Sequence, residues 1–144
     1  MENYILQKSL GFKLDAAARL TTGNFSRKLK EVSLSITPEQ WGIISFLYQE
    51  EGVTQNQLTK LVRKDHTCVS RLVESLIKKG IVKKVPSPDD KRVNHIYLTE
   101  LGQQMENSAV AVSKENLAKV FDGVTDEEKA VFSKVLDKII ENLE

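Results

Sequence analysis

The 144-residue sequence is poor in the residues that build covalent or metal-held frameworks, with one cysteine, Cys68, and two histidines. A single cysteine excludes an intramolecular disulfide framework and a multi-thiolate zinc site, and it is typical of a reducing compartment, so we expect a cytoplasmic protein. No apolar run approaches the roughly 18 residues that span a bilayer. The start, from Met1 to Tyr4, lacks the basic segment of an export signal. We therefore expect no membrane partner.

The sequence also lacks a recognisable catalytic or metal-binding pattern. The positions of His66, His95 and Cys68 do not match a nucleophile with its base or a metal site, so we do not expect an enzyme. Two alternatives stay open. One is a redox-responsive regulator, because a thiol in the first turn of a helix can be reactive. The other is a metal-responsive regulator that uses carboxylates with a histidine.

The formal net charge of +1 conceals an uneven distribution along the chain. Residues 54–98 hold ten basic and four acidic side chains, whereas residues 99–144 hold five basic and ten acidic ones. A basic segment of this kind attracts polyanions such as nucleic acids. Charge alone fits a solvated surface equally well, so the position of these residues on the fold has to decide.

Apolar spacing and capping residues predict a mainly α-helical chain forming one domain, as its length also indicates. Residues 4–32 read as one long helix. The segments Thr37-Pro38-Glu39-Gln40 and Thr54-Gln55-Asn56-Gln57 are capping boxes that start a second and a third helix. Asp65 caps a fourth helix, whose apolar positions repeat at intervals of three and four residues.

A small β-hairpin and two further helices are expected beyond the fourth helix. Residues 81–85 and 93–98 are β-prone, and the turn-rich segment 86–92 separates them. Beyond Thr99 we expect one helix to about Phe121 and another from a capping box at Thr125, with an apolar stripe that a partner subunit would cover. Two helices joined by a short turn and followed by a hairpin describe a winged helix-turn-helix.

The outward face of the fourth helix has the chemistry for reading DNA. An arginine fork pairs bidentately with guanine in the major groove, and hydroxyl groups contact base edges or phosphates, so Arg71 is the expected base reader. The first turn reaches deepest into the groove, and its amides favour phosphate. A merely solvated helix face is the alternative reading. The expected contacts on this helix are His66, Thr67, Cys68, Ser70, Arg71 and Lys78.

The hairpin tip and the starts of neighbouring helices supply further candidates. An arginine at an exposed tip can enter the minor groove, so we expect Lys91 and Arg92 to contact DNA there. Asp90 is expected to orient Arg92 through a charge-assisted hydrogen bond, although a plain solvated turn is possible. Contacts to phosphate, which set register without reading sequence, are expected from Gln55, Asn56 and Lys64.

Several of these segments occur together in one known family. They are Leu34 to Trp41, Gly52 to Gln55, Asp65 to Leu76, Lys79-Gly80, and Asp90 to Arg92 followed by Leu98 to Gly102. In order and spacing, over essentially the full chain, the sequence resembles the MarR family of bacterial winged helix-turn-helix transcription regulators. The resemblance implies a single domain over residues 1–144. Segments 1–33 and 100–144 would hold the dimerisation helices, and segment 34–99 the DNA-binding lobe.

The resemblance also implies a function. A homodimer would bind a pseudo-palindromic operator in double-stranded DNA, with Ser70 and Arg71 in the major groove and Arg92, supported by Asp90, in the minor groove. It would act as a repressor without a resident cofactor, and a small aromatic or phenolic effector would release it from DNA. The residues that bind such effectors vary widely within the family. Cys68 departs from the family, which usually carries Ser or Thr there. A winged-helix module that binds protein or RNA is the alternative.

Overall fold

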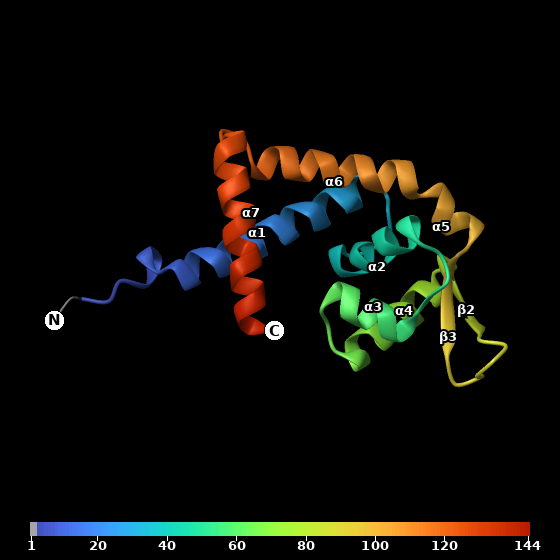
Figure 1. Ribbon diagram of the computed structural model, residues 1–144. Helices are drawn as coiled ribbons and strands as arrows, with labels where there is room; N and C mark the ends of the chain where they lie inside the picture. The colour runs from blue at the N-terminus through green and yellow to red at the C-terminus, as the bar shows by residue number, and fades with distance from the viewer. Residues whose placement is uncertain (1–2) are drawn as a thin grey trace.

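The computed structural model describes residues 3–144, so Met1 and Glu2, with which the expected first dimerisation segment begins, lie outside the described residues. Figure 1 shows α1 and α6 running side by side as one arm, α7 crossing that arm, and α2 to α5 gathered with the strands in a lobe. In chain order the elements are η1 (Leu6–Lys8), α1 (Leu10–Glu31), α2 (Pro38–Gln49), β1 (Val53–Thr54), α3 (Gln55–Val62), α4 (His66–Lys78), β2 (Val82–Pro86), β3 (Asn94–Leu98), α5 (Glu100–Gln104), α6 (Glu106–Val120) and α7 (Asp126–Leu143).

The predicted helix starts are confirmed where the signal is a capping box. In α2, α3 and α7 the capping threonine accepts a hydrogen bond from the backbone three residues on, and that residue's side chain accepts one in return. The Asp65 carboxylate accepts from the Cys68 backbone N–H at 2.7 Å and starts α4. These local bonds satisfy backbone donors that a helix start leaves without partners, which is why a short sequence pattern suffices.

Two predicted helix boundaries are wrong. The first helix begins at Leu10, capped by Ser9, and not near Tyr4, because a separate 3₁₀ turn precedes it. Beyond Thr99 the chain forms three helices and not two, since α5 ends at Gln104 and α6 starts after Met105. The chain changes partner here, because α5 packs against β3 whereas α6 packs along α1.

The sheet has three antiparallel strands in the order β1-β3-β2, so the prediction of a two-stranded hairpin missed one strand. The hairpin itself is present, with Val82 opposite Leu98 and Pro86 opposite Asn94. The added strand is only two residues long, and Val53 pairs with Ile96. Gly52, with φ +78°, makes the turn into it. So short a strand carries no alternation from which it could be recognised.

The main core lies inside the lobe and includes the end of α1. Leu29 of α1 is fully buried together with Ile43 and Leu47 of α2 and Val73 and Leu76 of α4. By contrast, α7 contributes no buried residue. None of the helices between residues 3 and 144 has the length and hydropathy to cross a membrane.

A row of aromatic side chains joins the arm to the lobe. Phe25 of α1 meets Trp41 of α2 edge to face at 6.4 Å between ring centroids, and Trp41 lies 6.2 Å from Tyr48. The Tyr48 hydroxyl donates to the Gly102 carbonyl of α5 at 2.6 Å. Burial, assisted by the charge of Glu106, raises the pKa of Tyr48 to about 12, so this donor keeps its proton at neutral pH.

Candidate nucleic-acid interface

The fourth helix presents one polar face because its other face is held in the core. Val69, Val73 and Leu76 are buried, and α4 packs against α2, α3 and β2. The predicted contact residues lie on or beside the opposite side of the same helix. His66, Thr67, Arg71 and Lys78 are exposed, whereas Cys68 and Ser70 are half-buried.

The acidic residue on this face, Glu74, is paired with the wing, which is the hairpin of β2 and β3 with the turn between them. Its carboxylate accepts a hydrogen bond from the ammonium group of Lys84 on β2. This bond and the positive charge of Lys84 hold the pKa of Glu74 below its usual range. The pair connects α4 to the wing, and it offsets a negative charge that would otherwise repel a phosphate backbone.

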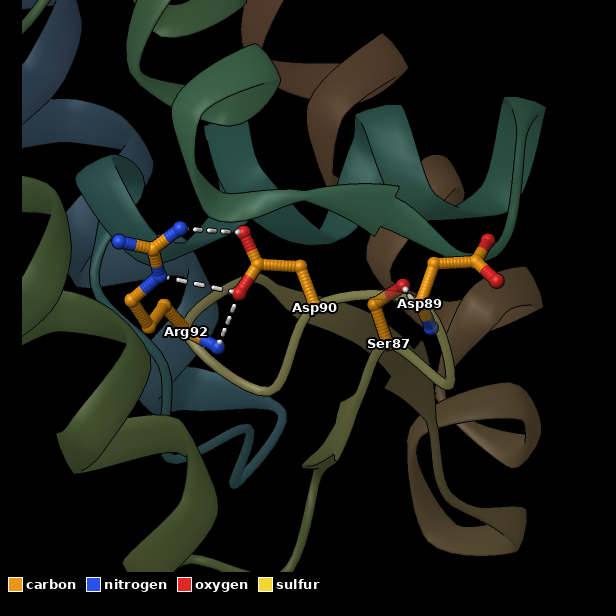
Figure 2. Close-up of polar contacts among 4 residues, drawn as sticks. All are labelled: Ser87, Asp89, Asp90 and Arg92. Atoms are coloured by element: carbon orange, nitrogen blue, oxygen red, sulfur yellow. Dashed lines mark hydrogen bonds and ion pairs between the residues drawn. The ribbon is translucent and has the colours of Figure 1, made fainter.

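The wing tip places an arginine in solvent and holds it from one side. Figure 2 shows the Arg92 guanidinium facing the Asp90 carboxylate, with Nε 3.1 Å from Oδ1 and Nη2 3.2 Å from Oδ2. The Arg92 backbone N–H also donates to Asp90 Oδ1, at 3.0 Å. These bonds lower the pKa of Asp90. The Arg92 side chain is nevertheless 90% exposed, and Lys91 beside it is exposed as well.

Backbone bonds close the tip of the wing and fix where Asp90 and Arg92 lie. The Ser87 N–H donates to the Val93 carbonyl at 2.8 Å, and the Val93 N–H donates to the Asp90 carbonyl at 3.0 Å. The Ser87 hydroxyl also accepts from the Asp89 N–H at 3.3 Å (Figure 2). The arginine therefore extends from a turn whose backbone is itself hydrogen-bonded.

The three predicted phosphate contacts lie around α3 in different settings. Asn56 is exposed in the first turn of α3, and Gln55 beside it is half-buried. Lys64, in the turn between α3 and α4, is half-buried and lies 3.8 Å from the Glu39 carboxylate of α2. The ammonium of Lys64 is thus already shared with an acidic group of the lobe.

Three residues that the sequence did not single out as site residues connect α2 to α4. The Gln40 side-chain amide donates to the Ser75 hydroxyl at 3.0 Å, and the Lys79 ammonium donates to the Gln40 amide oxygen at 2.9 Å. The capping pattern identified Gln40, but only as part of a helix start. No pattern within the sequence indicates which residues of α4 lie above it.

The remaining nucleophilic and basic candidates are dispersed. Cys68 is a free thiol in the first turn of α4. His95, on β3, has its Nδ1 2.7 Å from the Gly52 carbonyl oxygen. Over residues 3–144, no three side chains of His, Cys, Asp or Glu gather closely enough to hold a metal ion.

An apolar groove lies away from the α4 face, between α1, α6 and α7. Its volume is about 1070 Å³, and its walls include Leu14, Ala18, Leu117, Phe132 and Val135. Several wall residues are solvent-exposed although apolar, among them Val131 at 63% and Val135 at 45%. Contiguous exposed apolar surface of this kind marks an interaction site.

Known proteins share both the sequence pattern and the fold. A model of the MarR family matches residues 34–93. The chain is 30% identical over 105 residues to the uncharacterized HTH-type transcriptional regulator YsmB of Bacillus subtilis, and the match covers 73% of this chain and 72% of that protein.

The fold of this chain is similar to that of a cysteine-to-serine mutant of MarR from E. coli complexed with operator DNA, with a TM-score of 0.83, 23% identity, and 90% and 92% of the two chains covered. It is also similar to BpsR of Bordetella bronchiseptica, from work on the regulation of its DNA binding by 6-hydroxynicotinic acid, with a TM-score of 0.87, 19% identity, and 96% and 97% covered. The chain belongs to the MarR family of winged-helix transcriptional regulators.

Proposed function

We propose that this protein is a sequence-specific regulator that binds double-stranded DNA and works by binding and not by catalysis. The observation that carries the proposal is the outward face of α4, where Arg71 is exposed beside the half-buried hydroxyl-bearing Ser70, on the same lobe as the exposed wing arginine. A helix of this shape fits the major groove, and an arginine at the tip of a wing fits the minor groove. Because its target is DNA, we place the protein in the cytoplasm.

The proposed contacts divide by task. Arg71 reads bases, with Ser70 and Thr67 beside it, and Arg92 enters the minor groove in an orientation that Asp90 holds. The remaining contacts position the lobe on the phosphate backbone or approach the groove from the first turn of α4. They are His66, Cys68, Lys78, Lys91, Gln55, Asn56 and Lys64.

A second copy of the chain is the proposed occupant of the apolar groove. Segments 1–33 and 100–144 carry the helices that line it, and the exposed stripe of α7 has too few partners within one chain. Burying the stripe against a copy of itself removes apolar area from water and stabilises a two-fold dimer. The two α4 helices would then meet successive half-sites of a pseudo-palindromic operator.

Repression and release follow from this arrangement. A dimer that covers an operator blocks access to the promoter. A ligand that changes the separation of the two α4 helices weakens binding by its difference in affinity between the two arrangements. Regulation of BpsR by 6-hydroxynicotinic acid supports a small aromatic or phenolic effector for this chain too.

Selection of DNA ligands by the purified protein tests the proposal. From a pool of random duplexes, the expected product is a pseudo-palindromic sequence with half-sites about one helical turn apart. Gel-shift titration at several salt concentrations should then show tighter binding to that duplex than to a scrambled duplex, with affinity falling steeply as salt rises. Equal binding to the selected duplex, the scrambled duplex and double-stranded RNA would instead favour a non-specific or RNA-interaction module.

A further inference from the structure

Gln40 is a buried polar side chain with more bonds than a helix start requires. It lies at the third position of α2 and is 3% exposed, and Asn116 is the other buried polar residue between residues 3 and 144. Its amide oxygen accepts from the Thr37 N–H at 3.1 Å and from the Lys79 ammonium at 2.9 Å. Its amide nitrogen donates to the Ser75 hydroxyl at 3.0 Å. Both ends of the amide are therefore bonded.

The capping box accounts for only part of this network. Gln57 holds the same position in α3 and makes the same reciprocal bonds with Thr54, yet it is exposed. The bonds from Gln40 to Ser75 and Lys79 are thus additional. Both partners lie at the carboxyl-terminal end of α4, four residues apart, and so on one side of that helix.

Directional bonds constrain α4 in a way that its apolar contacts do not. Val69, Val73 and Leu76 favour burial but permit small rotations and shifts, since the hydrophobic effect is non-directional. Hydrogen bonds weaken steeply when their angles change. Contacts that read bases need side chains held within about 0.5 Å. A bond network between α2 and α4 supplies that constraint from one flank of α4, beside the proposed DNA face.

We infer that Gln40 is a positioning residue for DNA recognition, which sets the rotation and axial position of α4 through Ser75 and Lys79. Arg71 lies one helical turn before Ser75, so a rotation at Ser75 moves the guanidinium with it. Because α2 directly follows α1, the same bonds also fix α4 relative to the proposed dimerisation arm. The inference rests on the proposed function and deepens it.

The test compares two matched substitutions, Gln40→Met and Gln57→Met. Each removes one capping amide, but only the first also removes the bonds to α4. The measurement is the ratio of dissociation constants for scrambled and selected duplexes, together with tolerance of half-site spacings changed by one base pair. We expect Gln40→Met to lower the ratio about tenfold, because two directional bonds to α4 are lost, and to weaken the spacing preference. Gln57→Met should change neither.

Further variants test for rescue and guard against the case that Gln40→Met does not fold. Gln40→Glu should restore the ratio, because a carboxylate accepts from the Thr37 N–H, the Lys79 ammonium and the Ser75 hydroxyl. If Gln40→Met does not fold, Ser75→Ala and Lys79→Met each remove one bond, and each should lower the ratio about threefold by the same reasoning.

Two results would overturn the inference, and they differ from each other. Gln40→Met, or Ser75→Ala and Lys79→Met together, could retain the discrimination and spacing preference of Gln57→Met, and then Gln40 would be structural only. Alternatively, the wild-type protein could bind selected and scrambled duplexes equally. The proposed function would then fail first, and the inference with it.

Discussion

Two arginines of the proposed interface have different surroundings, and we propose different tasks for them. Arg71 extends from a rigid helix whose opposite face is in the core, which suits a bidentate contact with one base pair. Arg92 extends from a turn and is held by the Asp90 carboxylate on one side only. Its guanidinium keeps an exposed edge for the acceptors and the negative potential of the minor groove.

Replacing Arg71 with alanine should remove sequence discrimination while preserving the fold. A bidentate arginine–guanine pair contributes about 1 to 3 kcal/mol to discrimination, so the selected duplex should lose most of its advantage over the scrambled one. Gel-shift titration of both duplexes measures this ratio. Arg19→Ala, which removes an exposed arginine of α1 that pairs with Asp15, is the control. Equal ratios for the two variants would contradict the assignment of Arg71.

Replacing Asp90 with asparagine separates orientation from repulsion at the wing. Asparagine keeps one oxygen acceptor but loses the charge and the second oxygen, so operator affinity should fall several-fold if Asp90 orients Arg92. If the carboxylate merely repels phosphate, affinity should rise. Pairing with Arg92 lowers the pKa of Asp90. The carboxylate is therefore charged at any pH above the usual pKa range of aspartate, and it loses these bonds only when the pH falls below that range. The difference between wild type and variant should therefore stay constant between about pH 5 and 8.

At the scale of the elements, α5 connects the wing to the arm, and Gly102 permits the close packing at this connection. A Cβ at this position would lie 2.3 Å from the Ile81 carbonyl oxygen, which belongs to the backbone. The Thr99 N–H also donates to that oxygen, at 3.0 Å, and the Gly102 carbonyl accepts from Tyr48. Hairpin, α2 and α5 thus meet at one residue that has no side chain.

Gly102→Ala should therefore destabilise the protein, by about 1 to 3 kcal/mol as for other overpacked sites, and lower its thermal midpoint. The matched change Gly23→Ala, within α1, meets no atom closer than 3.9 Å and should be neutral or stabilise by up to about 1 kcal/mol, because alanine favours the helix. Chemical denaturation of both variants checks the contrast. A Gly102→Ala protein as stable as Gly23→Ala would show that α5 and the Ile81 backbone can move apart at no cost in stability.

The sequence predicts the structure where a signal is local, and does not where two distant segments meet. The caps at Thr37, Thr54, Asp65 and Thr125 act within one turn, so their residues alone indicate the helix starts. The strand β1 exists only because β3 lies beside it, and the break at Met105 only because α5 and α6 pack on different neighbours. The second role of Gln40 likewise depends on α4. The DNA contacts themselves stay predictions until binding is measured.

At the scale of the whole molecule, the chain divides into a lobe that holds the main core and an arm that, together with α7, leaves apolar surface exposed. The acidic segment 99–144 forms α5, α6 and α7, and the basic segment 54–98 belongs to the lobe. The two segments meet where the Glu144 carboxylate pairs with the Arg63 guanidinium, in the turn between α3 and α4, while the face of α7 opposite its apolar stripe stays polar. The proposed dimer surface and the proposed DNA face thus lie on different parts of one chain.

Introducing a charge into the α7 stripe should dissociate the dimer without unfolding the lobe. Val135→Asp places a carboxylate at an apolar position of the groove that is 45% exposed in the single chain, so its cost arises when a second copy covers it. Sedimentation equilibrium should show monomers, and the two-half-site operator should bind far more weakly. Lys134→Asp, on the other side of α7, is the control. Monomeric wild-type protein would contradict the proposed assembly.

The aromatic row at the junction of arm and lobe gives the protein a built-in optical probe. Trp41 is the only tryptophan in the chain, and it lies between Phe25 of α1 and Tyr48 of α2, half-buried. Its emission depends on how much water reaches the indole and on the groups next to it. A ligand that moves the arm relative to the lobe should thus shift or quench the emission of one known residue, and candidate effectors can be screened on the unlabelled protein without DNA.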